Sequence, residues 1–180
     1  MRYLNEQRSR QMRQKGDDPN RLAILALLTA LAIIMGYVEM LIPAYPGIPG
    51  VKPGLCNIVI LVTLIMYSWK EALLVSLVRI LAVGFMFGNL FSISYSLAGS
   101  VLAIFIMALL IKTGRFGLVG ISASGGAMHG VGQMIVAHIV LPSLPFAGYA
   151  AMLILAGIVT GSLVGLISYE ILKRVMVQAG

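Results

Sequence analysis

The stretch ALLVSLVRILAVGFMF, Ala72 to Phe87, is otherwise apolar but carries a cation, Arg79, in its middle. As a helix rising about 1.5 Å per residue, it crosses most of a lipid bilayer. A cation at that depth costs roughly 3 kcal/mol on insertion scales. Something must offset this cost: a buried partner, a water-filled cavity or an anionic ligand.

The composition of the whole chain indicates an integral membrane protein. Hydrophobic residues make up 59% of the 180 residues and charged residues 11%, which is more apolar surface than a soluble domain of this size can bury. The net charge of +7 does not indicate nucleic-acid binding, because six basic residues fall within the first 21 positions and most others flank apolar segments. We expect one membrane domain, residues 22–174, after a basic cytoplasmic N-terminal segment, residues 1–21.

Six apolar segments read as transmembrane helices, at roughly 22–42, 54–68, 72–87, 90–111, 116–141 and 147–172. If the N-terminus is cytoplasmic, eleven of the thirteen Lys and Arg residues lie on the cytoplasmic side. Only Lys52 then lies outside and Arg79 within the membrane. The positive-inside rule therefore predicts an all-α, six-helix bundle of the cell membrane with both termini in the cytoplasm. Trp69, beside Lys70, is expected at the cytoplasmic membrane boundary.

The first external connection differs from the others in composition. The segment PAYPGIPGVKPG, residues 43–54, is rich in proline and glycine and cannot be helical. Such a loop at the outer mouth of a bundle can form a lid over a binding site. It can equally be a stiff connector.

The residues offer no recognisable catalytic or metal site. The two aspartates, Asp17 and Asp18, are adjacent in the basic tail, so no Asp-rich metal site of the prenyl-transferase kind can form. His129 and His138 are nine residues apart, on opposite faces of a helix, which disfavours a shared metal ion. Cys56 is the only cysteine, and no Gly-rich phosphate loop is present. We expect a non-enzymatic protein without a metal or cofactor.

Polar side chains gather in the outer half of the predicted spans. His129 lies near the middle of the fifth span, at about the depth of Arg79, and Gln133 lies one turn further outward on the same face. The others at the outer side are Glu39, Lys52, Asn57, Asn89 and Tyr95. This gradient predicts a pocket that opens outward and binds a small molecule through these eight residues.

Each of these residues also has a structural interpretation. Arg79 can form an ion pair with Glu39, and the His129 face can hydrogen-bond a neighbouring helix. Asn57 can cap the second span. Tyr95 can belong to the aromatic belt at the membrane interface.

Small residues form two stripes that permit close approach of another helix. They are Ala23, Ala26 and Ala30 in the first span, and Gly157, Gly161 and Gly165 in the last. The glycine stripe is expected to pack inside the protein. The alanine stripe, which includes an AxxxA motif, is the better candidate for an external partner.

Three blocks of sequence carry a family resemblance: PGVKPGLCNIVIL, WKEALLVSLVRILAVGFMFGNLFSISYSLAGS and GAMHGVGQMIVA. They resemble the Gx transporter family, whose members are often labelled heptaprenyl diphosphate synthase component I. The resemblance covers about residues 22–172. The family is similar in turn to the substrate-binding S components of energy-coupling factor (ECF) transporters, which are six-helix membrane proteins.

The resemblance implies a transport function. S components bind a vitamin or other micronutrient from outside, often under a lid that matches residues 43–54 here. They dock through an AxxxA motif, matched by Ala26 and Ala30, onto a transmembrane T component driven by two cytoplasmic ATPases. The substrate then crosses by toppling of the S component.

The label also bears on the substrate and on the alternatives. It suggests an isoprenoid or quinone precursor, and Arg79, Lys52 and His129 suit a diphosphate or carboxylate head group. The main alternative is a non-catalytic membrane subunit that anchors or regulates a prenyl diphosphate synthase. A third possibility is a carrier that works without an ECF module.

Overall fold

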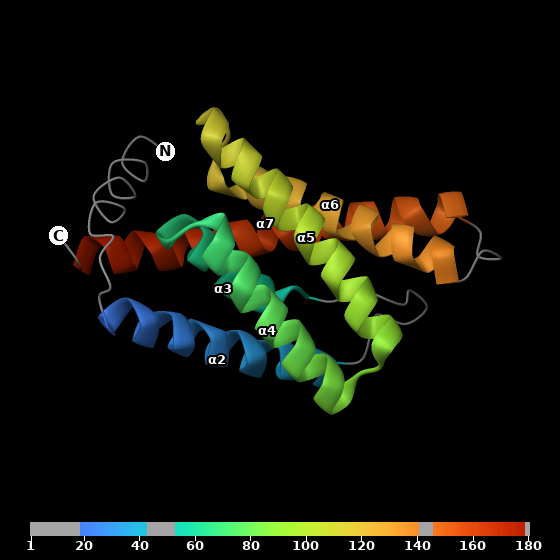
Figure 1. Ribbon diagram of the computed structural model, residues 1–180. Helices are drawn as coiled ribbons and strands as arrows, with labels where there is room; N and C mark the ends of the chain where they lie inside the picture. Colours follow the sequence, from blue (N-terminus) through green and yellow to red (C-terminus); the bar gives the residue numbers. More distant parts are fainter. Residues whose placement is uncertain (1–18, 43–52, 141–145, 179–180) are drawn as a thin grey trace.

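The structure, a computed structural model, describes residues 19–42, 53–140 and 146–178, and all secondary structure in them is α-helical. The helices are α2 (Pro19–Leu41), α3 (Leu55–Met66), α4 (Trp69–Phe87), α5 (Leu90–Thr113), α6 (Leu118–Val140) and α7 (Phe146–Gln178), shown in Figure 1. Each helix coincides with one of the six predicted segments to within a few residues. Of the predicted loop 43–54, only Pro53 and Gly54 are described, and Lys52 lies outside the described residues.

Three of these helices are long and apolar enough to cross a membrane, judged by length and composition: Asn20–Leu41, Leu90–Thr113 and Gly148–Val175. The α3 helix is also apolar but has only 12 residues, a length of about 18 Å against a hydrocarbon core of about 30 Å. These helices support the prediction that the chain is a membrane protein. The six-span arrangement and its orientation remain predictions.

The basic residues of the described chain lie mostly at one end of the helix bundle. They sit at the start of α2, the start of α4, the α5–α6 turn and the end of α7: Arg21, Lys70, Lys112, Arg115, Lys173 and Arg174. These helix ends share the left side of Figure 1. We call this the basic end. Such clustering agrees with a cytoplasmic location for all of them.

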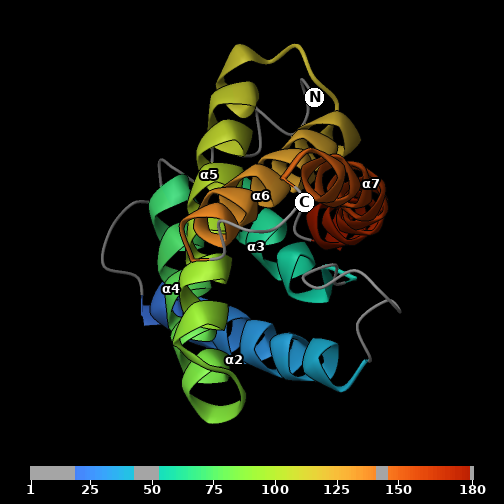
Figure 2. The same ribbon diagram turned by 90° about the vertical axis from the view of Figure 1, so that its right-hand side faces the viewer.

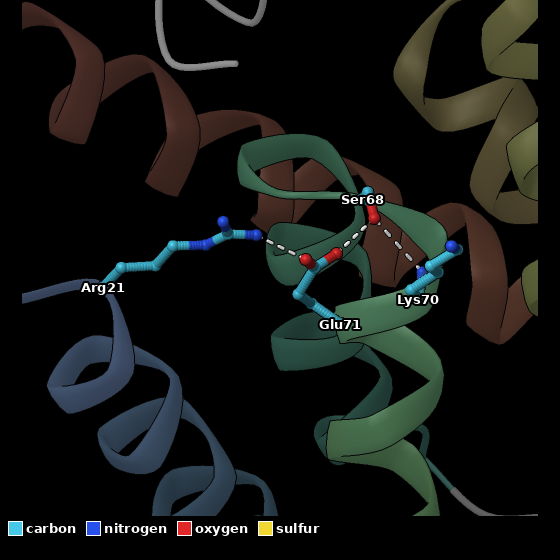
Figure 3. Close-up of polar contacts among 4 residues, drawn as sticks. All are labelled: Arg21, Ser68, Lys70 and Glu71. Carbon is cyan, nitrogen blue, oxygen red and sulfur yellow. Dashed lines mark hydrogen bonds and ion pairs between the residues drawn. The ribbon is translucent and has the colours of Figure 1, made fainter. Parts of the chain in front are cut away.

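A polar cluster joins α2 to α4 at the basic end (Figure 3). The Arg21 guanidinium forms an ion pair with the Glu71 carboxylate, which also accepts a hydrogen bond from the Ser68 hydroxyl. Ser68 is the N-cap of α4, and its oxygen accepts from the Lys70 N–H at 3.3 Å. Arg21 also lies over the Tyr67 ring, 5.7 Å from its centroid. The cluster therefore fixes where α4 begins and holds α2 beside it.

Trp69, the first residue of α4, lies at the same end. Its side chain is 45% exposed, and the Lys70 ammonium lies 5.8 Å from its ring centroid. An exposed indole beside a lysine at a helix end is typical of a membrane boundary.

The α3 helix lies in the middle of the bundle (Figure 2), in contact with α2, α4 and α7. Every residue from Val59 to Ile65 is buried, and Leu61 and Leu64 are only 1% exposed. A helix that is apolar on all sides belongs in an interior. Its central position accounts for its short length, because its ends need not reach beyond its neighbours.

Glycines let α5, α6 and α7 approach until backbone touches backbone. A Cβ atom added to Gly126 would lie 1.9 Å from the carbonyl oxygen of Gly157, and one added to Gly161 would lie 2.6 Å from that of Ser122. On the α5 side, a Cβ at Gly132 would lie 2.5 Å from the Ala98 carbonyl oxygen. The interpretation of the glycine stripe as internal packing is therefore confirmed.

Candidate ligand-binding site

A cavity of about 270 Å³ lies in the half of the bundle opposite the basic end. Residues in the last turn of α2 and in the first turns of α3, α5 and α7 line it. The sequence-predicted site residues that line it are Glu39, Asn57, Arg79, Asn89, Tyr95, His129 and Gln133. The structure thus brings together all of the predicted residues except Lys52, which it does not describe. Their role in binding a ligand remains a prediction.

Arg79 is buried in this cavity with no ion-pair partner among the described residues. Its side chain is 8% exposed and its Nε atom has no hydrogen-bond acceptor. Within the described residues it forms no ion pair, because the one found there joins Arg21 to Glu71. The Arg79 stem lies near Gly36 of α2, where an added Cβ would be in ordinary contact with Arg79 Cδ at 3.9 Å and in tighter contact with Val83 Cγ2 at 3.2 Å. A buried guanidinium without a counter-charge requires water or a ligand to offset its desolvation.

The alternative of an ion pair between Arg79 and Glu39 is not formed among the described residues, where the Glu39 carboxylate contacts the start of α3. The Glu39 carboxylate accepts a hydrogen bond from the Leu55 N–H at 2.5 Å and one from the Cys56 thiol at 2.9 Å. The N-cap of α3 is Gly54, which has φ of 79° and no side chain to cap the helix. A carboxylate from α2 therefore satisfies the orphan N–H group of Leu55 and interacts favourably with the helix dipole.

Two asparagines line the cavity in different ways. Asn57 is not the cap of its helix, as one interpretation held, because Gly54 occupies that position. Asn89 does cap a helix: it is the N-cap of α5, and its side-chain oxygen accepts from the Ser92 N–H at 2.8 Å. The Asn89 NH₂ group is therefore not used by the cap and can donate to other partners.

Tyr95 is part of the cavity wall and not of an interfacial belt. Its side chain is 7% exposed, and its hydroxyl lies 3.0 Å from that of Tyr149 on α7. The Phe91 ring packs beside it, with ring centroids 5.5 Å apart. Tyr149 lines the same cavity, and the sequence analysis did not identify it. A lone tyrosine near the end of an apolar span has no periodic signal that separates a cavity residue from an interfacial one.

His129 and Gln133 face the cavity from α6, one turn apart. The His129 ring packs on Gly99 of α5, where an added Cβ would come within 2.8 Å of it. Gln133 is 8% exposed, and its side chain forms no hydrogen bond with another described residue. The alternative that His129 and Gln133 together join helices by hydrogen bonding stays a prediction.

A smaller pocket of about 40 Å³ continues inward past His129. It is lined mainly by apolar groups of α3 and α5, together with Ser100, whose hydroxyl oxygen is buried without a partner. This volume is enough for an ordered water molecule. His129 thus lies at the boundary between a polar cavity and a narrow inner extension.

The sequence analysis also missed the backbone part of the cavity wall. Gly126, Gly130 and Gly157 line the cavity, and each also allows α6 and α7 to touch. The stripe pattern predicted the helix contact but not that its outer edge borders a cavity.

The site combines the Arg79 cation with the Glu39 carboxylate, which is engaged by the start of α3, and with several uncharged hydrogen-bonding groups. No group of three His, Cys, Asp or Glu side chains in the described ranges is arranged to hold a metal ion. The arrangement is suited to binding the polar head of a small molecule, with Arg79 as the anion contact.

Comparison with protein families identifies a family that covers most of the chain. The family described as heptaprenyl diphosphate synthase component I matches residues 28–171, a range that includes every cavity residue named above. No curated protein and no solved structure matches the chain.

Proposed function

The chain belongs to the heptaprenyl diphosphate synthase component I family, and we propose that it captures a small solute for an ATP-driven importer. In this proposal it is the S component of an ECF-type transporter, with six spans in the cell membrane and both termini in the cytoplasm. The observation that carries the proposal is Arg79, which is buried in a polar cavity of about 270 Å³ without an ion-pair partner in the described part of the chain.

The free-energy cost of burying Arg79 favours a role in ligand binding over a role in helix packing. A cation in the middle of a span costs roughly 3 kcal/mol, and the nearby carboxylate of Glu39 is engaged by the start of α3. An anionic or electron-rich ligand that binds Arg79 would offset this cost. With the basic end in the cytoplasm, the cavity lies in the outer half of the membrane, where a solute can enter from outside.

The alanine stripe on α2 supports a partner in the membrane. Ala23, Ala26 and Ala30 are all exposed, and the flanking Leu27 and Ile34 are 69% and 55% exposed. The stripe is smooth enough for another helix to approach closely. We assign it to the T component, which two cytoplasmic ATPases would drive.

Co-purification tests this assignment. The affinity-tagged full chain is expected to recover the T component and both ATPases from cells that express them. Replacing Ala26 and Ala30 by Leu is expected to abolish recovery while solute binding persists, whereas Ala151→Leu, at an exposed position of α7, is expected to have no effect. Unchanged recovery by the double variant would exclude the stripe as the docking face. Uptake in cells that lack any ECF module would instead indicate a carrier that works alone.

A second candidate function is a non-catalytic membrane subunit of a prenyl diphosphate synthase. The description of the family favours it, because it names a component of such an enzyme. The aspartates that a prenyl-transferase metal site needs are limited to Asp17 and Asp18, so catalysis would belong to the partner. Recovery of a soluble prenyl synthase with the tagged chain, without a T component, would support this candidate.

A further inference from the structure

The charges around the cavity restrict the class of solute that it accepts. Among the described lining residues, only Arg79 and Glu39 carry a full charge, apart from the titratable His129. Both oxygens of Glu39 already accept hydrogen bonds, from Leu55 and Cys56. Arg79 is therefore the fixed cation available to a solute, and it is nine-tenths buried with an unsatisfied donor.

One guanidinium matches one carboxylate in both charge and geometry. Its planar fork of N–H donors binds the two oxygens of a carboxylate in a bidentate manner. A diphosphate would bring further negative charges that no described lining cation neutralises, in a cavity that also contains the Glu39 carboxylate. In a site of low dielectric constant, an uncompensated charge weakens binding by roughly 100-fold or more.

The rest of the cavity favours an uncharged polar group on the same solute. Gln133 is also nine-tenths buried, and its amide has no partner among the described residues. Asn57 lines the cavity beside the Glu39-capped start of α3. Buried amides of this kind select solutes that hydrogen-bond to them and reject analogues that do not.

The volume also limits the solute. The cavity of about 270 Å³ lies at the lower edge of the range of roughly 300–1,000 Å³ for small-molecule sites. A cavity of this volume holds a compact molecule but not the whole of a long isoprenoid chain.

We propose that the cavity binds a compact monocarboxylate bearing an amide or hydroxyl group, with its carboxylate on Arg79 and its neutral polar group on Gln133. This inference rests on the solute-capture part of the proposed function. Of the two head groups considered for the solute, diphosphate and carboxylate, it selects the carboxylate.

Ligand-induced stabilisation of the purified full chain in detergent tests the proposal. Thermal unfolding is followed by far-UV circular dichroism with two kinds of probe: N-acylated amino acids such as hippurate, and isopentenyl diphosphate. The concentration dependence of the shift gives an apparent Kd for each probe. We expect at least one monocarboxylate to bind about 100-fold more tightly than the diphosphate, and its uncharged primary amide to lose that binding.

Variants test whether Arg79 makes the contact with the solute carboxylate. Arg79→Gln is expected to weaken monocarboxylate binding about 100-fold and Arg79→Lys less, because lysine keeps the charge but not the fork. Arg174→Gln, at an exposed arginine of α7, is the matched control and is expected to bind normally. Gln133→Ala is expected to weaken amide-bearing probes more than simple aliphatic carboxylates.

Two results would overturn the proposal: stronger stabilisation by the diphosphate, or no stabilisation by any monocarboxylate. If Arg79→Gln does not fold, the comparison of probes on the unmodified chain still decides between the classes. Diphosphate binding would leave solute capture intact and change only its class. Carboxylate binding without recovery of importer subunits would instead refute the transport assignment alone.

Discussion

Replacement of Gly157 by alanine tests the backbone contact between α6 and α7 most directly. The added Cβ would lie 2.2 Å from the carbonyl oxygen of Gly126, whereas a carbon and a carbonyl oxygen meet at about 3.3 Å. The helices must therefore separate locally by about 1 Å, which forfeits a quarter to a half of the dispersion attraction at each contact. Overpacking of this kind costs about 1–3 kcal/mol, and the better helix propensity of alanine offsets up to about 1 kcal/mol of it.

The expected net loss for Gly157→Ala is about 1–2 kcal/mol in the free energy of unfolding. It is measured by titrating the protein in mixed micelles with a denaturing detergent and following helix content by circular dichroism. Gly148→Ala in the same helix is the control, because an added Cβ there meets nothing within 4 Å. We expect that variant to be as stable as the unmodified chain or slightly more stable. Equal stability of the two alanine variants would refute the backbone contact.

Three further predictions use the same measurement of unfolding. Arg21→Gln and Glu71→Gln should each lower stability by about 0.2–1 kcal/mol, because the ion pair is partly exposed; a coupling energy well above this range in a double-mutant cycle would contradict that. Tyr95→Phe and Tyr149→Phe should each cost about 1 kcal/mol, and the double variant should cost little more than either, whereas additive losses would argue against their shared hydrogen bond. Glu39→Ala should cost about 1–2 kcal/mol and speed hydrogen exchange at the first amides of α3; unchanged exchange would exclude capping by this carboxylate.

The helices could be predicted from the sequence because apolar length and helix breakers are local properties. The boundaries that differ do so for identifiable reasons. The third predicted span begins at Ala72, whereas α4 begins at Trp69 and includes the charged Lys70 and Glu71. Ser68 caps the helix there, and Glu71 accepts the Ser68 hydroxyl hydrogen bond and pairs with α2. Charged residues in a first helical turn are compatible with a membrane helix when they lie at its boundary.

The sequence indicated which residues lie near one another in the site, but not which of them contact one another. Depth in the membrane follows from position along each span, and this was enough to group Arg79 with His129 and Gln133. The partner of Glu39 depends instead on how α2 meets the start of α3, which no pattern within either segment encodes. The contact between Tyr95 and Tyr149 likewise depends on the packing of two distant helices.

The position of Trp69 has a practical consequence for spectroscopy. It is the only tryptophan in the chain, and it is half exposed at the basic end, beside Lys70. The cavity lies in the opposite half of the bundle and contains no tryptophan among its described lining residues. Indole emission depends on the polarity of its immediate surroundings, so the tryptophan emission of this protein, excited selectively over its tyrosines, should respond to an event at the basic end and not to filling of the cavity. The emission of Trp69 can therefore distinguish an event at the basic end from one at the cavity without an added label.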